Sequence, residues 1–179
     1  MNLQIKNTSD NTSEINLFGE IGESWFSEGI TMQSVSDQIK NLASENIILN
    51  ISSLGGDVNH ALAIHDILKT HKAHITAKII GATASAGTIV ALGADSVEMS
   101  DNALFLVHNA WTFAAGNAED MRKVAGDLDT FDSRIVNIYK KKTKKAKSDI
   151  EDLMSEEKWI TASEAKDFGF VDSVYKPTK

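Results

Sequence analysis

Ser85 stands in a run of small residues, 83–87, between an apolar segment at 75–80 and a shorter one at 88–92. A serine can act as a nucleophile on a tight turn from strand to helix, where its oxygen is accessible and helix-start amides stabilise negative charge. The alternative is a hydroxyl that only caps the helix. The run lacks the first glycine of the G-x-S-x-G pattern, so these residues alone leave both interpretations open.

His108 is the histidine best placed to serve as a base for such a serine. Histidine is the usual base because its unperturbed pKa is about 6.5. His108 follows the apolar run 104–107, and catalytic side chains are often presented at such positions. A histidine that only satisfies local polar groups is the alternative. The other histidines fall in a predicted helix or a polar connection: His60, His65, His71 and His74.

Metal and thiol chemistry are not expected from this chain. It contains no cysteine, which excludes disulfides, cysteine–zinc sites and thiol nucleophiles. His71 and His74 have no third ligand nearby, and no histidine-glutamate-x-x-histidine helix occurs. We therefore expect neither a metal nor a cofactor.

Gly55 and Gly56 are candidates for a second part of the site. They follow the β-branched run 47–51 and precede Asp57, which can cap a helix. A glycine amide carries no side-chain obstruction, so it suits either a tight turn or an oxyanion hole.

Strands and helices are predicted to alternate around these turns. Residues 14–17 alternate as a strand does, and 31–43 have helical spacing. Segments 47–51 and 75–80 are each followed by a small-residue turn and a helix. This order favours an α/β fold with parallel strands and helices on the faces of the sheet. Two further strands are predicted, at 96–99 and 104–107.

A long helix capped by Asn117 is predicted next, with a narrow apolar stripe on a polar rod. The stripe can pack on its own domain or on another subunit, and the spacing does not choose between them. Lysines crowd the segment 140–147, where a solvated helix end is the preferred interpretation. The stripe consists of Met121, Val124, Leu128, Phe131, Ile135 and Ile138.

The composition limits the classes of function. With 179 residues and 19.5 kDa, one domain over residues 1–179 is expected. A net charge of −7 disfavours nucleic-acid binding. No apolar run approaches the roughly 18 residues that a membrane span needs, and the first residues do not resemble a secretory signal. We expect a cytoplasmic protein that binds neither nucleic acid nor membrane.

Four segments, in their order and spacing, resemble the ClpP peptidase family. The resemblance extends from about residue 15 to residue 175. Within this family, the chain most resembles the shorter ClpP-like proteins of phages and prophages, some of which are similar to head-maturation proteases. The reason is that it lacks the extended amino-terminal segment of the housekeeping peptidase. The segments are 52–56 with the following helix, 81–87, 106–109, and 159–165 leading to 169–172.

The resemblance implies a role for each candidate residue. Ser85 would be the nucleophile, His108 the general base, and the amides of Gly56 and Ala86 the oxyanion donors. Glu157 would be the third triad member, where the ATP-dependent peptidases commonly have aspartate and the phage-type branch has glutamate. The adjacent Glu156 is the alternative third member, and a solvated surface acid is the other interpretation of Glu157.

The resemblance also implies architecture and partners. We expect a crotonase-like ClpP spiral of strand-turn-helix units, with a projecting handle of a strand plus the long helix at about residues 109–142. Subunits of such families assemble into homo-oligomeric rings. The implied substrate is an extended or unfolded polypeptide, added as a strand between the backbone after Gly56 and the segment after His108. An AAA+ unfoldase or phage capsid proteins are the candidate partners.

Two other functions compete with a serine endopeptidase. A crotonase-type acyl-CoA enzyme would share the fold, but its chemistry needs no serine nucleophile, so the pair Ser85 and His108 argues against it. A catalytically inactive ClpP-like assembly subunit is the second alternative. Retention of all three candidate triad groups argues against that interpretation.

Overall fold

The structure is a computed structural model that describes residues 3–9, 11–23, 29–40 and 42–178. Eight strands form one mixed sheet. They are β1 (Leu3–Ser9), β2 (Thr12–Phe18), β3 (Asn46–Ser53), β4 (His74–Ala84), β5 (Ser96–Ser100), β6 (Leu104–Leu106), β7 (Ile160–Thr161) and β8 (Ser173–Tyr175). The order is β1-β2-β3-β4-β5-β8, and β6 lies between β4 and β7.

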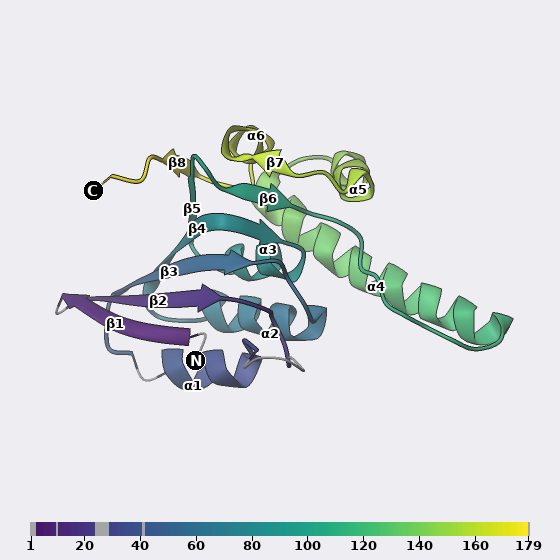
Figure 1. The fold of residues 1–179 in the computed structure, drawn as a ribbon, viewed down its shortest axis with the longest axis horizontal. Coiled ribbons are helices and arrows are strands. Elements are labelled where there is room, and N and C mark those ends of the chain that lie inside the picture. Colours follow the sequence, from purple (N-terminus) through teal and green to yellow (C-terminus); the bar gives the residue numbers. More distant parts are fainter. Residues whose placement is uncertain (1–2, 10, 24–28, 41, 179) are drawn as a thin grey trace.

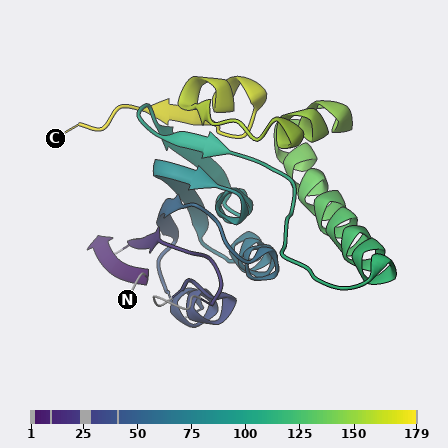
Figure 2. The ribbon, with the colours of Figure 1, turned by 45° about the vertical axis from the view of Figure 1, so that its right-hand side comes forward.

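Helices cover one face of the sheet and extend from one side of it. The helices are α1 (Met32–Ile39), α2 (Val58–Lys69), α3 (Ala86–Ala91), α4 (Ala118–Thr143), α5 (Lys147–Glu156) and α6 (Ala162–Phe168). Figures 1 and 2 show α1, α2 and α3 along the same face, whereas α4 leads away from the body. None of the helices in the described part of the chain is long and apolar enough to span a membrane.

The parallel core confirms the predicted α/β class. β2, β3, β4, β5 and β8 pair in parallel in this order, and β6 pairs in parallel with β4. Among the described strands, the antiparallel pairs are β1 with β2 and β6 with β7. Ile15, Leu49 and Ala77 are register partners on adjacent strands, and all three are buried. Burial of a side chain such as Leu49 contributes about 1.5–3 kcal/mol, so this apolar face fixes the register.

β4 is longer than the sequence predicted and changes partner along its length. Its first part pairs with β5 over 76–79, and its last part pairs with β6 over 82–84. The predicted turn at 81–87 is therefore a strand up to Ala84, because pairing with β6 continues the ladder through these small residues. The turn itself is confined to Ser85, where the chain enters α3.

The handle consists of a helix and an unpaired extended segment. Asn117 caps α4 as predicted, and its side chain accepts hydrogen bonds from the amides of Glu119 and Asp120. The expected strand of the handle is not formed: residues 109–116 have no strand pairing within the described chain. A lone extended segment has no neighbour in this chain with which to exchange backbone hydrogen bonds.

Candidate active site

Ser85 occupies a strained position between β4 and α3. Its backbone has φ 53° and ψ −128°, a conformation that residues with a side chain seldom adopt. It stands at the N-cap of α3, but its side chain makes no capping hydrogen bond. The interpretation of Ser85 as a simple cap is therefore wrong, and its hydroxyl is left for another role.

The pairing of β4 with β6 brings Ser85 and His108 to the same edge of the sheet. Ala84 is the register partner of Leu106, and the Ser85 amide donates a hydrogen bond of 2.9 Å to the Leu106 carbonyl. Both strands are parallel, so their carboxyl ends meet there. His108 follows two residues after Leu106, and its side chain is 14% exposed. In the described chain no hydrogen bond joins the Ser85 hydroxyl to the His108 ring, a contact that often tightens only when substrate binds.

The antiparallel pairing of β6 with β7 brings Glu157 to His108. Leu104 pairs with Thr161 and Phe105 with Ile160, and continuing this register places residue 157 opposite residue 108. Glu157 Oε1 lies 3.5 Å from His108 Nδ1. This is an ion-pair distance, longer than the roughly 2.6–3.2 Å of a full hydrogen bond. Because Nδ1 faces the carboxylate, Nε2 is the ring nitrogen left for a proton from serine.

Glu156, the alternative third member, has a different partner. Its carboxylate lies 3.2 Å from Lys158 Nζ, and both side chains are 55% exposed. The ion pair with His108 is formed by Glu157.

Two of the candidate residues, Ser85 and Glu157, have a strained backbone. Among the described residues, the non-glycine residues with positive φ are Ser85, Lys144 and Glu157. Glu157 ends α5 in the left-handed conformation, with φ 49° and ψ 34°. Such a conformation costs about 1–2 kcal/mol for a residue with a side chain. Strain of this kind is typical of functional sites.

Gly55 and Gly56 lie against the Ser85 turn, where a side chain could not fit. A Cβ on Gly55 would stand 2.7 Å from the Cβ of Ser85, and one on Gly56 would stand 2.0 Å from the Ile21 carbonyl oxygen. Ile21 exchanges backbone hydrogen bonds with Gly55 and Asp57, which turns the Gly56 amide away from Ile21. A second amide is supplied by Ala86, the first residue of α3, since the first amides of a helix have no partner within it.

A cavity of about 710 Å³ opens beside these glycines. Leu54, Gly55 and Gly56 form one side of it, and the exposed Trp111 from the segment after His108 forms another. Gly55 also contacts the Ser85 turn. Ser85 and His108 are not among the residues that line this cavity, and Gly55 is the lining residue that lies against the Ser85 turn.

The remaining histidines have structural partners. His60 Nδ1 accepts a hydrogen bond from the Met32 amide, and His71 Nε2 lies 3.1 Å from the Ile39 carbonyl oxygen. His65 and His74 lie 2.9 and 3.7 Å from the carboxylates of Asp66 and Asp95. No cluster of three or more metal-binding side chains forms within the described residues.

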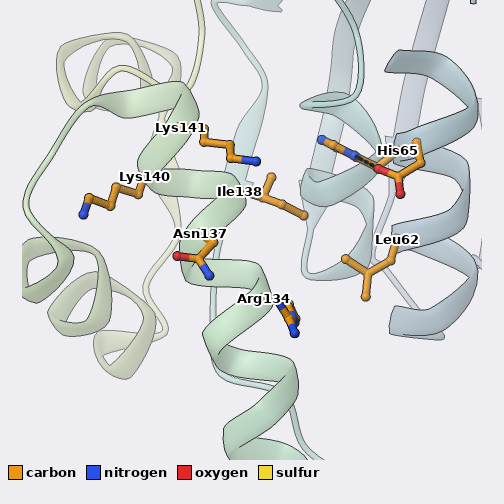
Figure 3. A pocket seen from close by; sticks show the side chains of 8 residues that line it. Leu62, His65, Arg134, Asn137, Ile138, Lys140 and Lys141 are labelled. Atoms are coloured by element: carbon orange, nitrogen blue, oxygen red, sulfur yellow. Dashed lines mark hydrogen bonds and ion pairs between the residues drawn. The ribbon is translucent and has the colours of Figure 1, made fainter. Parts of the chain in front are cut away.

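A second cavity, of about 720 Å³, separates α4 from α2 (Figure 3). Leu62 and His65 line it from α2, and Arg134, Ile138 and Lys141 line it from α4. None of the candidate residues of the serine site lies there.

Two residues beside the turn were not singled out from the sequence. Thr88, fully buried in α3, donates a hydrogen bond of 2.7 Å to the Ser85 carbonyl oxygen. The hydroxyl of Tyr139, on α4, lies 2.7 Å from the Thr88 hydroxyl. Burial raises the pKa of the Tyr139 hydroxyl well above its ordinary value, so it stays protonated. Tyr139 follows Ile135 of the apolar stripe by four residues, and this helical spacing is the sequence signal that could have found a buried tyrosine in need of a hydrogen-bond partner.

The fold is a largely parallel α/β sheet in which Ser85, His108 and Glu157 come together where β4, β6 and β7 pair. Comparison with known proteins gives the family. The family model for Clp protease matches residues 3–178, and the chain belongs to this protease family.

Individual relatives agree with this assignment. The chain is 29% identical over 161 residues to "ATP-dependent Clp protease proteolytic subunit 1" of Chlamydia pneumoniae and of Chlamydia abortus, covering 84% of this chain and 84% of each relative. A solved structure of a ClpP1 mutant from Listeria monocytogenes is similar with a TM-score of 0.75 and 25% identity, covering 89% of both chains. The predicted ClpP-like fold is thus confirmed.

Proposed function

We propose that this chain is a serine endopeptidase, a single ClpP-like domain over residues 1–179, with Ser85, His108 and Glu157 as its triad. The observation that carries the proposal is the meeting of three strand ends. β4 leads to Ser85, β6 leads to His108, and the segment before β7 carries Glu157, whose carboxylate lies 3.5 Å from the His108 ring. The Clp protease family match supports the same chemistry.

In the proposed mechanism, His108 moves one proton in each half of the reaction. Ser85 Oγ attacks the scissile carbonyl carbon as its proton passes to His108 Nε2, and the Gly56 and Ala86 amides donate to the oxyanion. The C–N bond breaks as His108 returns the proton to the leaving amine. Water then attacks the acyl-enzyme, again losing its proton to His108, and Ser85 leaves with that proton. Glu157 stabilises the imidazolium throughout.

The proposed substrate is an extended or unfolded polypeptide. The cavity beside Gly56 and Trp111 is lined by backbone after β3 and by the segment after His108, and residues 109–116 form no strand pairing within the described chain. A peptide laid there would gain main-chain hydrogen bonds, so its sequence would matter less than its accessibility.

We also propose that the subunits assemble into a ring in the cytoplasm and receive substrate from a partner. The relatives in Chlamydia carry the name of a proteolytic subunit of an ATP-dependent protease, which supports an AAA+ unfoldase as that partner. The glutamate at position 157 is the residue that supports the phage-type branch, for which a capsid protein would be the substrate and head maturation the role.

Ser85→Ala tests the proposal. Hydrolysis of an unfolded protein and of a fluorogenic peptide should fall by at least about a thousandfold with the fold unchanged, since loss of a nucleophile costs that much or more. Ser133→Ala is the matched control, because Ser133 is an exposed serine on α4 that bonds only within its helix. A fluorophosphonate should label the wild type and Ser133→Ala, but not Ser85→Ala.

Two outcomes would contradict the proposal. Undiminished hydrolysis by a contaminant-free Ser85→Ala preparation would exclude this nucleophile. A wild type that neither hydrolyses peptides nor takes up the label would favour the catalytically inactive assembly subunit. The Clp protease match already argues against a crotonase-type acyl-CoA enzyme.

A further inference from the structure

Tyr139 extends a chain of hydrogen bonds from the handle helix to the candidate nucleophile. Its side chain is 1% exposed, and its ring packs edge-on against Phe170 with 5.4 Å between centroids. Its hydroxyl lies 2.7 Å from Thr88 Oγ1, and Thr88 Oγ1 lies 2.7 Å from the Ser85 carbonyl oxygen. Thr88 is itself fully buried, so neither hydroxyl can exchange its protein partner for bulk water.

The direction of these hydrogen bonds follows from the groups involved. The Ser85 carbonyl oxygen can only accept, so the single proton of the Thr88 hydroxyl points to it. The Thr88 oxygen must then accept from Tyr139, whose phenol stays protonated because burial raises its pKa. The donors therefore run in one direction, from Tyr139 to Thr88 to Ser85.

The Ser85 carbonyl is one end of a peptide group whose other end is the Ala86 N–H. A peptide group is planar, so fixing its oxygen also fixes the direction of its N–H. The Ser85 oxygen receives a second hydrogen bond, of 2.9 Å, from the Thr88 amide. Thr88 therefore holds this peptide group with both its side chain and its backbone.

We infer that Tyr139 and Thr88 are positioning residues that orient and polarise the Ala86 amide as an oxyanion donor. The inference rests on the proposed serine-peptidase function. It gives the handle helix α4 an indirect part in transition-state stabilisation, through the hydrogen bonds that start at its buried end.

Two physical effects support this role. The Ser85 backbone is strained at φ 53°, so the peptide that follows it needs restraint to keep one orientation. Hydrogen bonds in series also polarise one another, and donation to a carbonyl makes the N–H of the same peptide a stronger donor. Both effects act on the oxyanion of the transition state more than on the bound substrate, so they change kcat rather than KM.

The test compares Tyr139→Phe with Tyr175→Phe, which removes the other tyrosine hydroxyl of the chain. Tyr139→Phe keeps the ring packed on Phe170 and should lower kcat about tenfold with KM unchanged, less than the hundredfold or more lost with an entire oxyanion donor. Thr88→Val should lower kcat at least as much. Thr88→Ser keeps the hydroxyl and should therefore retain most of the wild-type kcat. Tyr175→Phe should leave kcat unchanged.

Inhibitor affinity separates positioning from a general structural effect. A peptide boronate forms a tetrahedral adduct with an oxygen in the oxyanion site, whereas the matching peptide amide binds without one. Tyr139→Phe should weaken the boronate about tenfold and leave the amide unchanged. The double variant Tyr139→Phe with Thr88→Val should be no worse than Thr88→Val alone, because both act through one hydrogen-bond chain.

The outcomes distinguish this inference from the function on which it rests. If wild-type hydrolysis depends on Ser85 but Tyr139→Phe keeps full kcat and boronate affinity, the positioning role is wrong and the peptidase stands. An equal loss of affinity for boronate and amide would also overturn it, because that result indicates a distorted site. If the wild type shows no Ser85-dependent hydrolysis, the proposed function fails and the inference fails with it.

Discussion

Glu157 combines an exposed carboxylate with a strained backbone. Its side chain is 60% exposed, whereas that of His108 is 14% exposed, so the pair is open to solvent mainly on the acid side. Exposure weakens the electrostatic contribution of the carboxylate through solvent screening. The main effect expected of Glu157 is therefore to hold the imidazole in one tautomer, with Nδ1–H toward the acid and Nε2 toward Ser85.

Substitution of Glu157 by glutamine and by aspartate separates the effect of the carboxylate charge from the effect of side-chain length. Glu157→Gln should keep the fold but lower kcat by about a thousandfold or more, because an amide can hold the wrong tautomer and cannot balance the imidazolium. Glu157→Asp should lose less, since it keeps the charge and retracts the oxygens by roughly 1.5 Å. Glu156→Gln is the matched control and should leave peptide hydrolysis unchanged. A fully active Glu157→Gln would remove Glu157 from the triad and leave Ser85 and His108 in place.

The left-handed backbone at Glu157 predicts that stability and activity conflict at this residue. Glu157→Gly should raise the free energy of unfolding by about 0.5–1 kcal/mol, because glycine adopts this conformation without steric cost, while activity is lost with the carboxylate. Lys144 ends α4 in the same conformation, at φ 60°, and lies outside the candidate site. Lys144→Gly should gain similar stability and keep its activity. Denaturant unfolding and peptide hydrolysis of both variants check this, and a destabilised Lys144→Gly would contradict the strain argument.

At the scale of elements, the site is formed by strand pairings that the sequence pattern could reveal only in part. The apolar runs before Ser85 and His108 were predicted as strands, so both residues were expected at strand ends. Their adjacency depends on β4 switching from β5 to β6, which no local pattern encodes. β7 has two residues, too few for a periodic signal, so the position of Glu157 came only from family resemblance.

Other elements escaped prediction for identifiable reasons. β1 contains Asn7 and Ser9, residue types that favour turns, and its described pairing is with β2. α5 is a short helix with few apolar residues, whose Ile150 and Met154 are fully buried against the rest of the fold. Tertiary contacts stabilise both elements more than their local propensities do.

Helix α6, which follows β7, begins with a capping box whose strength should depend on pH. The Glu164 carboxylate accepts hydrogen bonds from the Thr161 amide and hydroxyl, and these hold its pKa below the ordinary value. A lowered folded-state pKa means that the stabilisation is fully present above the ordinary glutamate pKa. It is lost as the pH falls through the lowered folded value.

Comparison of the wild type with Glu164→Gln checks this dependence. The wild type should be the more stable at neutral pH, and the difference in free energy of unfolding should shrink as the pH falls below about 4.3. Asp167→Asn is the control, since Asp167 is an exposed acid of the same helix without a hydrogen bond among the described residues. Denaturant titrations from neutral to acid pH measure all three proteins. A difference for Glu164→Gln that is constant over this range would show that the charge plays no part in the cap.

At the scale of the whole molecule, the apolar stripe of α4 serves two surfaces. Near its carboxyl end, Ile135 and Tyr139 are buried in the body of the same chain. Toward its amino end, Leu128 is only half-buried and Phe131 is 37% exposed. Packing of the stripe on its own domain is therefore confirmed for the carboxyl half of the helix. Packing on another subunit stays a prediction, and the open amino half is where we expect it.

Trp111 adds to the apolar surface on the handle. It is 65% exposed, Phe113 is 91% exposed, and their rings meet edge-on at 5.3 Å. Large exposed aromatic side chains grouped in this way are typical of an interaction surface. Together with the open half of α4, they make the handle the part of the molecule from which we expect assembly.

Charged substitutions on the open half of α4 test this assembly. In light scattering, the wild type should have a mass several times the 19.5 kDa of the chain. The double variant Leu128→Asp with Phe131→Asp should be smaller, because two carboxylates would be buried without partners at the interface. Thr130→Asp with Ser133→Asp adds the same charge at exposed polar positions of the same helix and should keep the wild-type mass. A wild type that is a monodisperse monomer at micromolar concentration would contradict the proposed ring. If both double variants shrink equally, the decisive factor is added charge rather than the apolar stripe.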